Sequence, residues 1–165
     1  MIILGIDPGF SVTGFGILKK EGSRVFVLDY GALKMSSRDT LAQRIAQFHD
    51  FFDAKIKQYG VTVLALETPF LGKNAQNFLK LGYLRGIIYL LSARYALPMQ
   101  EFSPREVKAA VTGFGGADKD QVARVILRLF PAMNQPDKLD ITDAMAVSLC
   151  GMWKTSSVTM RSTTF

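Results

Sequence analysis

The chain begins with a continuous apolar run at residues 2–6. Such a run is typical of a strand that is covered on both faces, in the middle of a sheet. The run ends at Asp7, and a Pro-Gly dipeptide then turns the chain. Residues 13–18 and 24–33 have strand patterns and are joined by a Lys-Lys-Glu-Gly-Ser turn. The opening pattern predicts a three-stranded antiparallel meander with an aspartate at the end of its first strand.

The next segment predicts a helix followed by a second buried strand. Apolar residues recur at intervals of three or four between Leu41 and Tyr59, with Ser36 or Ser37 as the expected N-cap. The strand at residues 61–67 follows this helix-length crossover, so it should lie parallel to the first strand. It ends in an acid, Glu67. Since parallel neighbours end at the same edge of a sheet, we expect Glu67 to meet the aspartate of the first strand there.

Residues 74–95 predict a helix that is apolar almost all round. Such a helix needs a cover on the side that faces away from the sheet. Gly82 and Gly86 form a GxxxG pair, which lets another backbone come close. We expect this helix to form a homodimer interface, with a helix buried inside one domain as the alternative.

Three further helices complete the predicted α/β domain. Ser103 and Asp118 are expected to cap the first two, and residues 138–153 form the last. Lys119 falls in a first helical turn, where a cation is unfavourable, so either an anionic partner or simple solvation must explain it. We expect residues 1–153 to form one domain and the Ser/Thr-rich residues 154–165 to be disordered.

The last helix adds two carboxylates to the predicted site. Asp140 and Asp143 are three residues apart and share a helical face. Structural roles are possible for some of the acids, because Asp7 could cap its own turn and Asp140 could cap the helix together with Asp137. Asp143 lies among apolar residues in mid-helix, where an aspartate is unfavourable. Four gathered carboxylates without His or Cys indicate Mg²⁺ or Mn²⁺, and two such ions would support phosphodiester hydrolysis.

Composition and charge restrict the class of protein further. The chain has 165 residues, one cysteine and a formal net charge of +6. Residues 73–128 carry 9 basic and 4 acidic side chains, so most of the excess charge is local. This distribution favours a polyanion partner such as nucleic acid, with ordinary surface solubility as the alternative. The chain lacks a signal-length or membrane-length apolar segment, so we expect a cytoplasmic protein without a membrane span.

Short motifs in a fixed order make the sequence resemble the RuvC family of Holliday-junction resolvases, in the ribonuclease-H-like superfamily. The resemblance covers about residues 1–150. The matching pieces are GIDPG at 5–9 with Thr13 and Gly14, Glu67 with Phe70 and KNA at 73–75, LKLG at 79–82, Arg85-Gly86, Arg105, Val107-Lys108, Val111, GFG at 113–115, AxKxQV at 117–122 and DxxDA at 140–144.

The resemblance implies a fold, an activity and partners. It implies a five-stranded mixed sheet in the order 3-2-1-4-5 with helices on both faces. The enzyme would be a homodimeric endonuclease that resolves four-way junctions by paired nicks in DNA recombination and repair, with a branch-migration motor of the RuvA/RuvB type. The implied metal-binding catalytic acids are Asp7, Glu67, Asp140 and Asp143, and the implied DNA-binding residues are Phe70, Lys73, Asn74, Arg105, Lys108 and Lys119.

Other functions fit parts of the same sequence pattern. A nuclease of the same fold could act on RNA or on other branched DNA. A DNA-binding protein that lost catalysis would gain nothing from four acids that repel phosphate. An actin-like or sugar-kinase ATPase also opens with an aspartate and a Gly-rich hairpin, but it needs two such domains and this chain has room for one.

Overall fold

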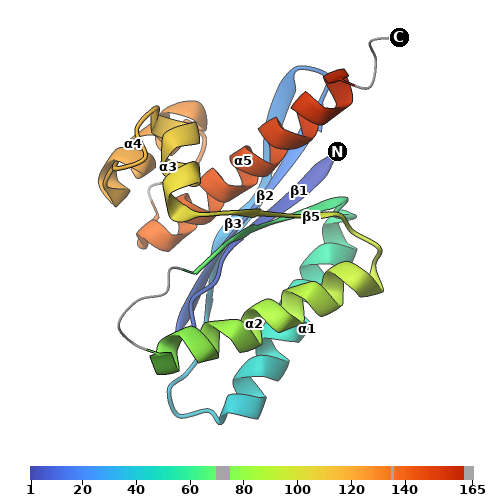
Figure 1. Cartoon of the computed structure of the whole chain (residues 1–165), viewed down its shortest axis with the longest axis vertical. Coiled ribbons are helices and arrows are strands. Elements are labelled where there is room, and N and C mark those ends of the chain that lie inside the picture. Colours follow the sequence, from blue (N-terminus) through green and yellow to red (C-terminus); the bar gives the residue numbers. More distant parts are fainter. Residues whose placement is uncertain (70–74, 135, 162–165) are drawn as a thin grey trace.

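The computed structural model describes residues 1–69, 75–134 and 136–161, the last six of these as backbone only. Its described part contains one five-stranded sheet in the order β3-β2-β1-β4-β5 (Figure 1). The strands are β1 (Ile2–Asp7), β2 (Val12–Glu21), β3 (Arg24–Lys34), β4 (Val63–Glu67) and β5 (Met99–Phe102). The helices are α1 (Leu41–Tyr59), α2 (Ala75–Arg94), α3 (Pro104–Thr112), α4 (Lys119–Leu129) and α5 (Leu139–Arg161).

The pairing of the strands confirms the predicted sheet. The first three strands form an antiparallel meander, and β4 and β5 add to β1 in parallel. Asp7 lies opposite Gly14 of β2, and Ile6 lies beside Leu66 of β4. Asp7 and Glu67 therefore end neighbouring central strands at the same edge of the sheet.

Helices cover both faces of the sheet, as Figure 1 shows. One hydrophobic cluster joins the sheet to α1 and α2, and a second joins it to α3, α4 and α5. The side chains of β1 alternate between them, because Ile3 belongs to the second cluster and Leu4 and Ile6 to the first. This two-sided burial explains why β1 is a continuous apolar run.

Helix α5 lies directly on β1 and β2 because glycines face it. A Cβ atom added at Gly14 would lie 2.0 Å from the carbonyl oxygen of Asp140, and one at Gly5 would lie 2.2 Å from Oγ of Ser148. The hydroxyl of Ser148 donates to the carbonyl of Gly16 at 2.9 Å across the same contact. The first turn of α5 is thereby held against the strand pair that carries Asp7.

The caps of α3 and α4 are confirmed, whereas the predicted cap of α1 is wrong. Ser103 and Asp118 each accept a hydrogen bond from the backbone N–H three residues later. Helix α1 instead begins after Thr40, not after Ser36 or Ser37. The side chain of Thr40 accepts from Gln43 N–H and the Gln43 side chain accepts from Thr40 N–H, so this reciprocal capping box fixes the start of the helix.

The structure differs from the boundary expected after residue 153. Helix α5 continues to Arg161, and residues 162–165 lie outside the described part. Gln100 of β5 donates to Oγ1 of Thr155 at 2.6 Å, and this hydroxyl donates to the carbonyl of Gly151 at 2.9 Å. The Nζ atom of Lys154 also lies 5.0 Å from the ring centre of Phe102. These contacts with β5 hold the extra turn, so the Ser/Thr-rich composition did not end the helix.

Two further observations bear on the class of protein. No helix in the described ranges is long and apolar enough to cross a membrane. Cys150 is buried, and burial raises the pKa of its thiol to about 12, so it is an unreactive core residue.

Candidate active site

Asp7 is held at the edge of the sheet by a turn that is fixed from two sides. The hydroxyl of Thr13 donates to the carbonyl of Gly9 at 2.8 Å and accepts from its N–H at 3.2 Å. Arg44 of α1 donates to the carbonyl of Phe10, and its guanidinium lies 3.8 Å from the centre of the Phe10 ring. The chain that leaves Asp7 is therefore bound both to β2 and to α1.

The structure brings Asp7 together with both acids of α5. One carboxylate oxygen each of Asp7, Asp140 and Asp143 lies within 4.8 Å of the other two. The first strand and the last helix supply these residues, and the glycine contacts between α5 and β2 set their separation. A spacing of this kind allows three carboxylates to share a metal ion.

Glu67 lines the same cavity but stands outside this group of three. The cavity has a volume of about 160 Å³. Asp7, Glu67 and Asp143 form its acidic wall, and Lys108 of α3 and Lys119 of α4 face them. Apolar side chains of α3 and α4 complete it, namely Pro104, Val107 and Val122. Three of the four predicted acids thus line one cavity, and Asp140 lies beside it in the group with Asp7 and Asp143.

Burial and mutual repulsion keep protons on these acids. Burial is the main reason that the pKa of Asp7 rises to about 7, and the charge of Asp143 raises it further. Burial and then the charge of Asp7 raise the pKa of Glu67 to about 8. The pKa of Asp143 is also raised by burial, although Lys119 opposes the change. If all these acids were ionised, the site would carry more negative charge than the protein compensates by itself.

Lys119 is the internal counter-ion of the site. Its Nζ atom lies 2.6 Å from Oδ2 of Asp143 and 3.5 Å from Oδ1 of Asp140. Burial alone would lower the pKa of Lys119, but the hydrogen bond and the charge of Asp143 raise it well above its usual value. The anionic partner that its helical position called for is thus present within the chain.

A divalent cation fits this set of residues. The donor atoms are all carboxylate oxygens, which are the ligands that Mg²⁺ and Mn²⁺ prefer and zinc does not. A cation would also remove the repulsion that raises the pKa values of Asp7 and Glu67. Asp7, Asp140 and Asp143 would hold the first ion, and Glu67 faces the space beside it.

The predicted DNA-binding residues are only partly described. Lys108 and Lys119 line the cavity, and Arg105 lies one turn before Lys108 on the exposed side of α3. Phe70, Lys73 and Asn74 lie outside the described residues.

The sequence interpretation missed the role of Arg44. This residue is buried, and it joins α1 to the turn after Asp7. A signal was available, because Arg44 lies three residues after Leu41, on the apolar stripe of the helix where an arginine is unexpected. Residue periodicity marks such a position but does not say which backbone group the arginine binds.

The sheet order, the helices on both faces and the acids at the edge of the central strands define the ribonuclease-H-like class of proteins. Within this class, the family model for the crossover junction endodeoxyribonuclease RuvC matches residues 3–151. The chain belongs to the RuvC family and is therefore a nuclease.

Curated relatives of this family match nearly the whole chain. A crossover junction endodeoxyribonuclease RuvC of Chloroherpeton thalassium is 43% identical over 158 residues, which are 96% of this chain and 85% of that protein. Another, of Alkaliphilus metalliredigens, is 38% identical over 150 residues, or 91% and 92% of the two chains.

Solved structures support the fold. The RuvC of T. thermophilus in complex with a Holliday junction substrate has a TM-score of 0.85 at 23% identity, over 94% of this chain and 96% of that one. The yeast mitochondrial Holliday junction resolvase Ydc2 has a TM-score of 0.66 at 14% identity, over 93% and 78% of the two chains. These likenesses confirm the ribonuclease-H-like fold.

Proposed function

We propose that the protein resolves four-way DNA junctions by nicking two strands symmetrically, through phosphodiester hydrolysis that depends on a divalent metal. The observation that carries the proposal is the group of Asp7, Asp140 and Asp143, whose oxygens approach within 4.8 Å from opposite ends of the chain. Membership of the RuvC family supplies the substrate class.

Mg²⁺ is the proposed metal, with Mn²⁺ as a substitute and two ions per site. The proposed ligands are Asp7, Glu67, Asp140 and Asp143. When bound, the ions would activate a water molecule for attack and stabilise the departing 3′ oxygen. Two of these ligands end the neighbouring strands β1 and β4, and the other two lie in the first two turns of α5.

The lysines of the cavity have a second role in this proposal. Lys108 and Lys119 face the acids across the cavity, where the scissile phosphate would enter. With Asp143 engaged as a metal ligand, the ammonium of Lys119 would no longer have to pair with that carboxylate. It can then bind a phosphate oxygen and orient the strand. Arg105, together with Phe70, Lys73 and Asn74, is proposed to contact DNA outside the cavity.

The proposed homodimer uses the outer side of α2. Leu84, Ile88 and Leu91 face the sheet and are buried. The opposite side is apolar as well, and Leu79 and Leu90 are 56% and 54% exposed. Cβ atoms added at Gly82 and Gly86 would meet nothing within 4 Å, so a second helix can approach closely there. A dimer would contain two catalytic cavities, one for each of the paired nicks. A motor of the RuvA/RuvB type is the proposed partner.

A synthetic four-way junction tests the function directly. The protein is incubated with the junction and Mg²⁺, and nicks are mapped on all four strands. Two nicks at symmetric positions are expected on opposed strands, with no cleavage in EDTA. The matched substrates are a linear duplex, a three-way junction and an RNA four-way junction. Equal cleavage of these substrates would replace junction resolution by a less specific nuclease activity, and junction binding without cleavage would identify an inactive binding protein.

A further inference from the structure

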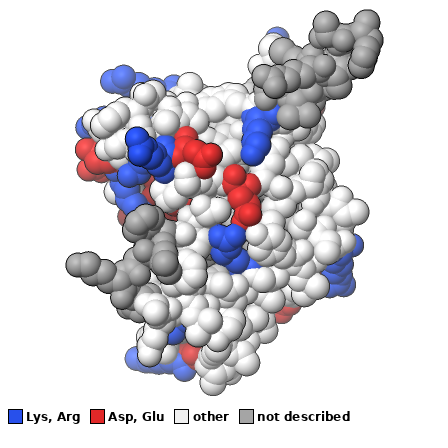
Figure 2. Space-filling model, in the orientation of Figure 1, with Lys and Arg blue, Asp and Glu red and all other residues white. Residues whose placement is uncertain are grey.

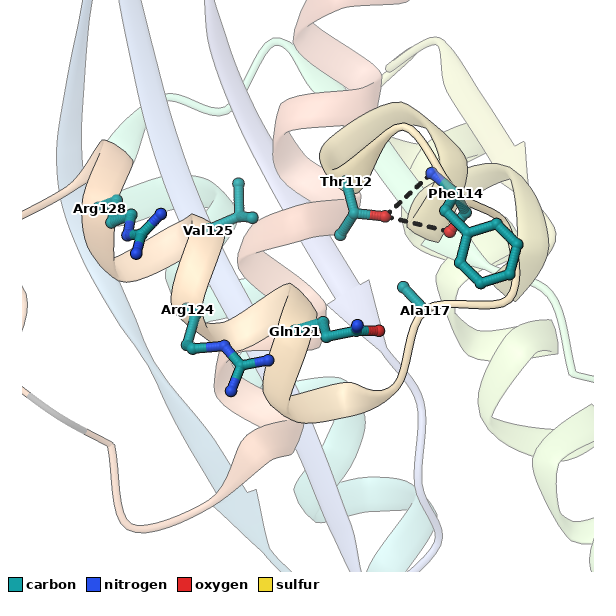
Figure 3. A pocket seen from close by; sticks show the side chains of 7 residues that line it. All are labelled: Thr112, Phe114, Ala117, Gln121, Arg124, Val125 and Arg128. Atoms are coloured by element: carbon teal, nitrogen blue, oxygen red, sulfur yellow. Dashed lines mark hydrogen bonds between the residues drawn. The ribbon is translucent and has the colours of Figure 1, made fainter.

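A second hollow lies between the end of α3 and the exposed side of α4, away from the catalytic acids (Figure 3). Its volume is about 250 Å³. Ala117 and Val125 contribute its apolar lining, and Arg124 and Arg128 border it from α4. We call this hollow the α3–α4 groove. Nothing in the proposed chemistry of the catalytic cavity uses it.

The groove is cationic. Arg124 and Arg128 are exposed and one turn apart on α4, and no carboxylate lines the groove. Within the part of the chain that the structure describes, neither arginine forms an ion pair, although Asp120 lies one turn before Arg124. The two arginines are separated by about 6 Å along the helix. Phosphates of one DNA strand rise about 3.4 Å each along the duplex axis, so this separation spans roughly two of them.

An aromatic ring stands beside the groove. Phe114 is 64% exposed, more than any other large hydrophobic side chain in the described part. The loop that carries it is hydrogen-bonded to α3, because the hydroxyl of Thr112 accepts from the N–H of Phe114 at 3.2 Å and donates to its carbonyl at 3.0 Å (Figure 3). The ring is therefore held out on a fixed loop, where it can cover an apolar surface of a ligand such as a deoxyribose.

Basic side chains connect the groove with the catalytic cavity. Lys108 lines the cavity, and Thr112, one turn later on α3, lines the groove. Arg105 lies against the α3–α4 loop, since a Cβ atom at Gly115 would be 2.7 Å from its Cγ. Figure 2 shows several basic side chains over α3 and α4, interspersed with acidic ones. A polyanion in the cavity thus finds further cations along α3 and around the loop to α4.

We propose that the α3–α4 groove is a second DNA contact, which holds backbone phosphates of a duplex arm of the junction. Arg124 and Arg128 bind the phosphates, and Phe114 packs against the adjacent sugar. The inference rests on the proposed function, because it assumes the junction substrate. It assigns these residues to anchoring of an arm, outside the catalytic cavity.

The test measures binding of a fluorescent four-way junction in EDTA over a range of salt concentrations. Each phosphate contact contributes about 0.9 to the slope of log affinity against log salt. The Arg124→Gln/Arg128→Gln variant should lose about 1 to 2 from this slope and bind on the order of ten times more weakly at moderate salt. The Arg124→Lys/Arg128→Lys variant keeps both charges and should keep the slope.

A matched control removes two charges elsewhere. Arg24 begins β3 and Lys57 lies in the last turn of α1, both at the end of the sheet opposite the acids. The Arg24→Gln/Lys57→Gln variant has the same net charge as the groove variant and should keep the wild-type slope. If the groove variant behaves like this control, the proposal is overturned and the groove is left for a protein partner.

Neutral phosphates locate the contact on the DNA. Short methylphosphonate patches are moved along each arm of the junction. At one position the patch should weaken binding by the wild type and leave the groove variant unaffected, because the lost contact is the same. Equal sensitivity of both proteins at every position would overturn the proposal. If the wild type binds the four-way junction no more tightly than a linear duplex, the proposed function itself is overturned.

Discussion

At the scale of single residues, the acids of the cavity destabilise the metal-free fold. Asp7 and Glu67 are half-buried carboxylates whose pKa values rise to about 7 and about 8. Lys119 offsets part of this cost through its contact of 2.6 Å with Asp143. Such an arrangement is unfavourable for stability and useful for binding cations.

Replacement of Asp7 separates these two effects. Asp7→Asn should lower Mg²⁺-dependent junction cleavage by roughly a hundredfold or more, because a metal ligand is lost. The metal-free variant should melt at a higher temperature than the wild type near pH 8, since one repelling charge has gone. Strand mapping and thermal melting in EDTA check the two results. Cleavage at the wild-type rate would remove Asp7 from the metal site.

The pH dependence of stability follows from the same groups. The ordinary pKa values of the Asp7 and Glu67 side chains are 3.8 and 4.5, and the folded state raises both. Between its ordinary and its raised pKa, each group binds more protons in the folded state. The contribution of these groups is therefore complete below 3.8 and is lost as pH rises from there through about 8. Metal-free protein should lose stability across this range, and stabilisation by Mg²⁺ should grow with pH.

Denaturant unfolding at several pH values, with EDTA or with Mg²⁺, measures this coupling. Asp7→Asn is the matched variant and should show a flatter dependence on pH. An identical pH profile with and without Mg²⁺ would contradict the assignment of these acids as ligands.

At the scale of elements, the contact of α5 with β2 decides the geometry of the site. A side chain at Gly14 would meet the carbonyl of Asp140 at 2.0 Å. Gly14→Ala should therefore push the first turn of α5 outward, cost roughly 1–3 kcal/mol of folding stability and abolish most of the metal-dependent activity. Gly31→Ala, where the added Cβ would meet only the ring edge of Phe15 at 3.1 Å, is the control and should cost less stability and leave metal binding unchanged.

Thermal melting and Mg²⁺ titration of these variants distinguish the two glycines. A stable Gly14→Ala protein with unaltered metal binding would show that α5 does not depend on this contact.

Sequence patterns predicted the elements better than their ends. The apolar run before Asp7 and the pair of acids at Asp140 and Asp143 located the site, because strand burial and helical spacing are local properties. The cap at Thr40 and the extension of α5 past residue 153 depend on particular partners, such as Gln43 and Gln100. The bond from Arg44 to Phe10 joins residues far apart in the chain, so no local pattern specifies it.

At the scale of the whole molecule, paired nicking needs two catalytic cavities. The outer side of α2 offers an apolar surface with two glycines that leave room for a second helix. A dimer through this surface buries side chains that are otherwise exposed, as is typical of permanent homodimers.

A charge in this surface should prevent the pairing. Leu90→Glu is expected to change the sedimentation of the protein from dimer to monomer and to reduce paired nicking, because the carboxylate would be desolvated in the interface. Phe26→Glu is the control, since Phe26 is 41% exposed and lies on the edge strand β3. A wild-type protein that sediments as a monomer at high concentration would refute the interface.

The acids of the site come from the first strand and the last helix of the described fold. A ribosome that has synthesised only the sheet-forming half of this polypeptide has made Asp7 without its companions. Nuclease activity should therefore appear only late in translation, after α5 leaves the exit tunnel and packs on the sheet.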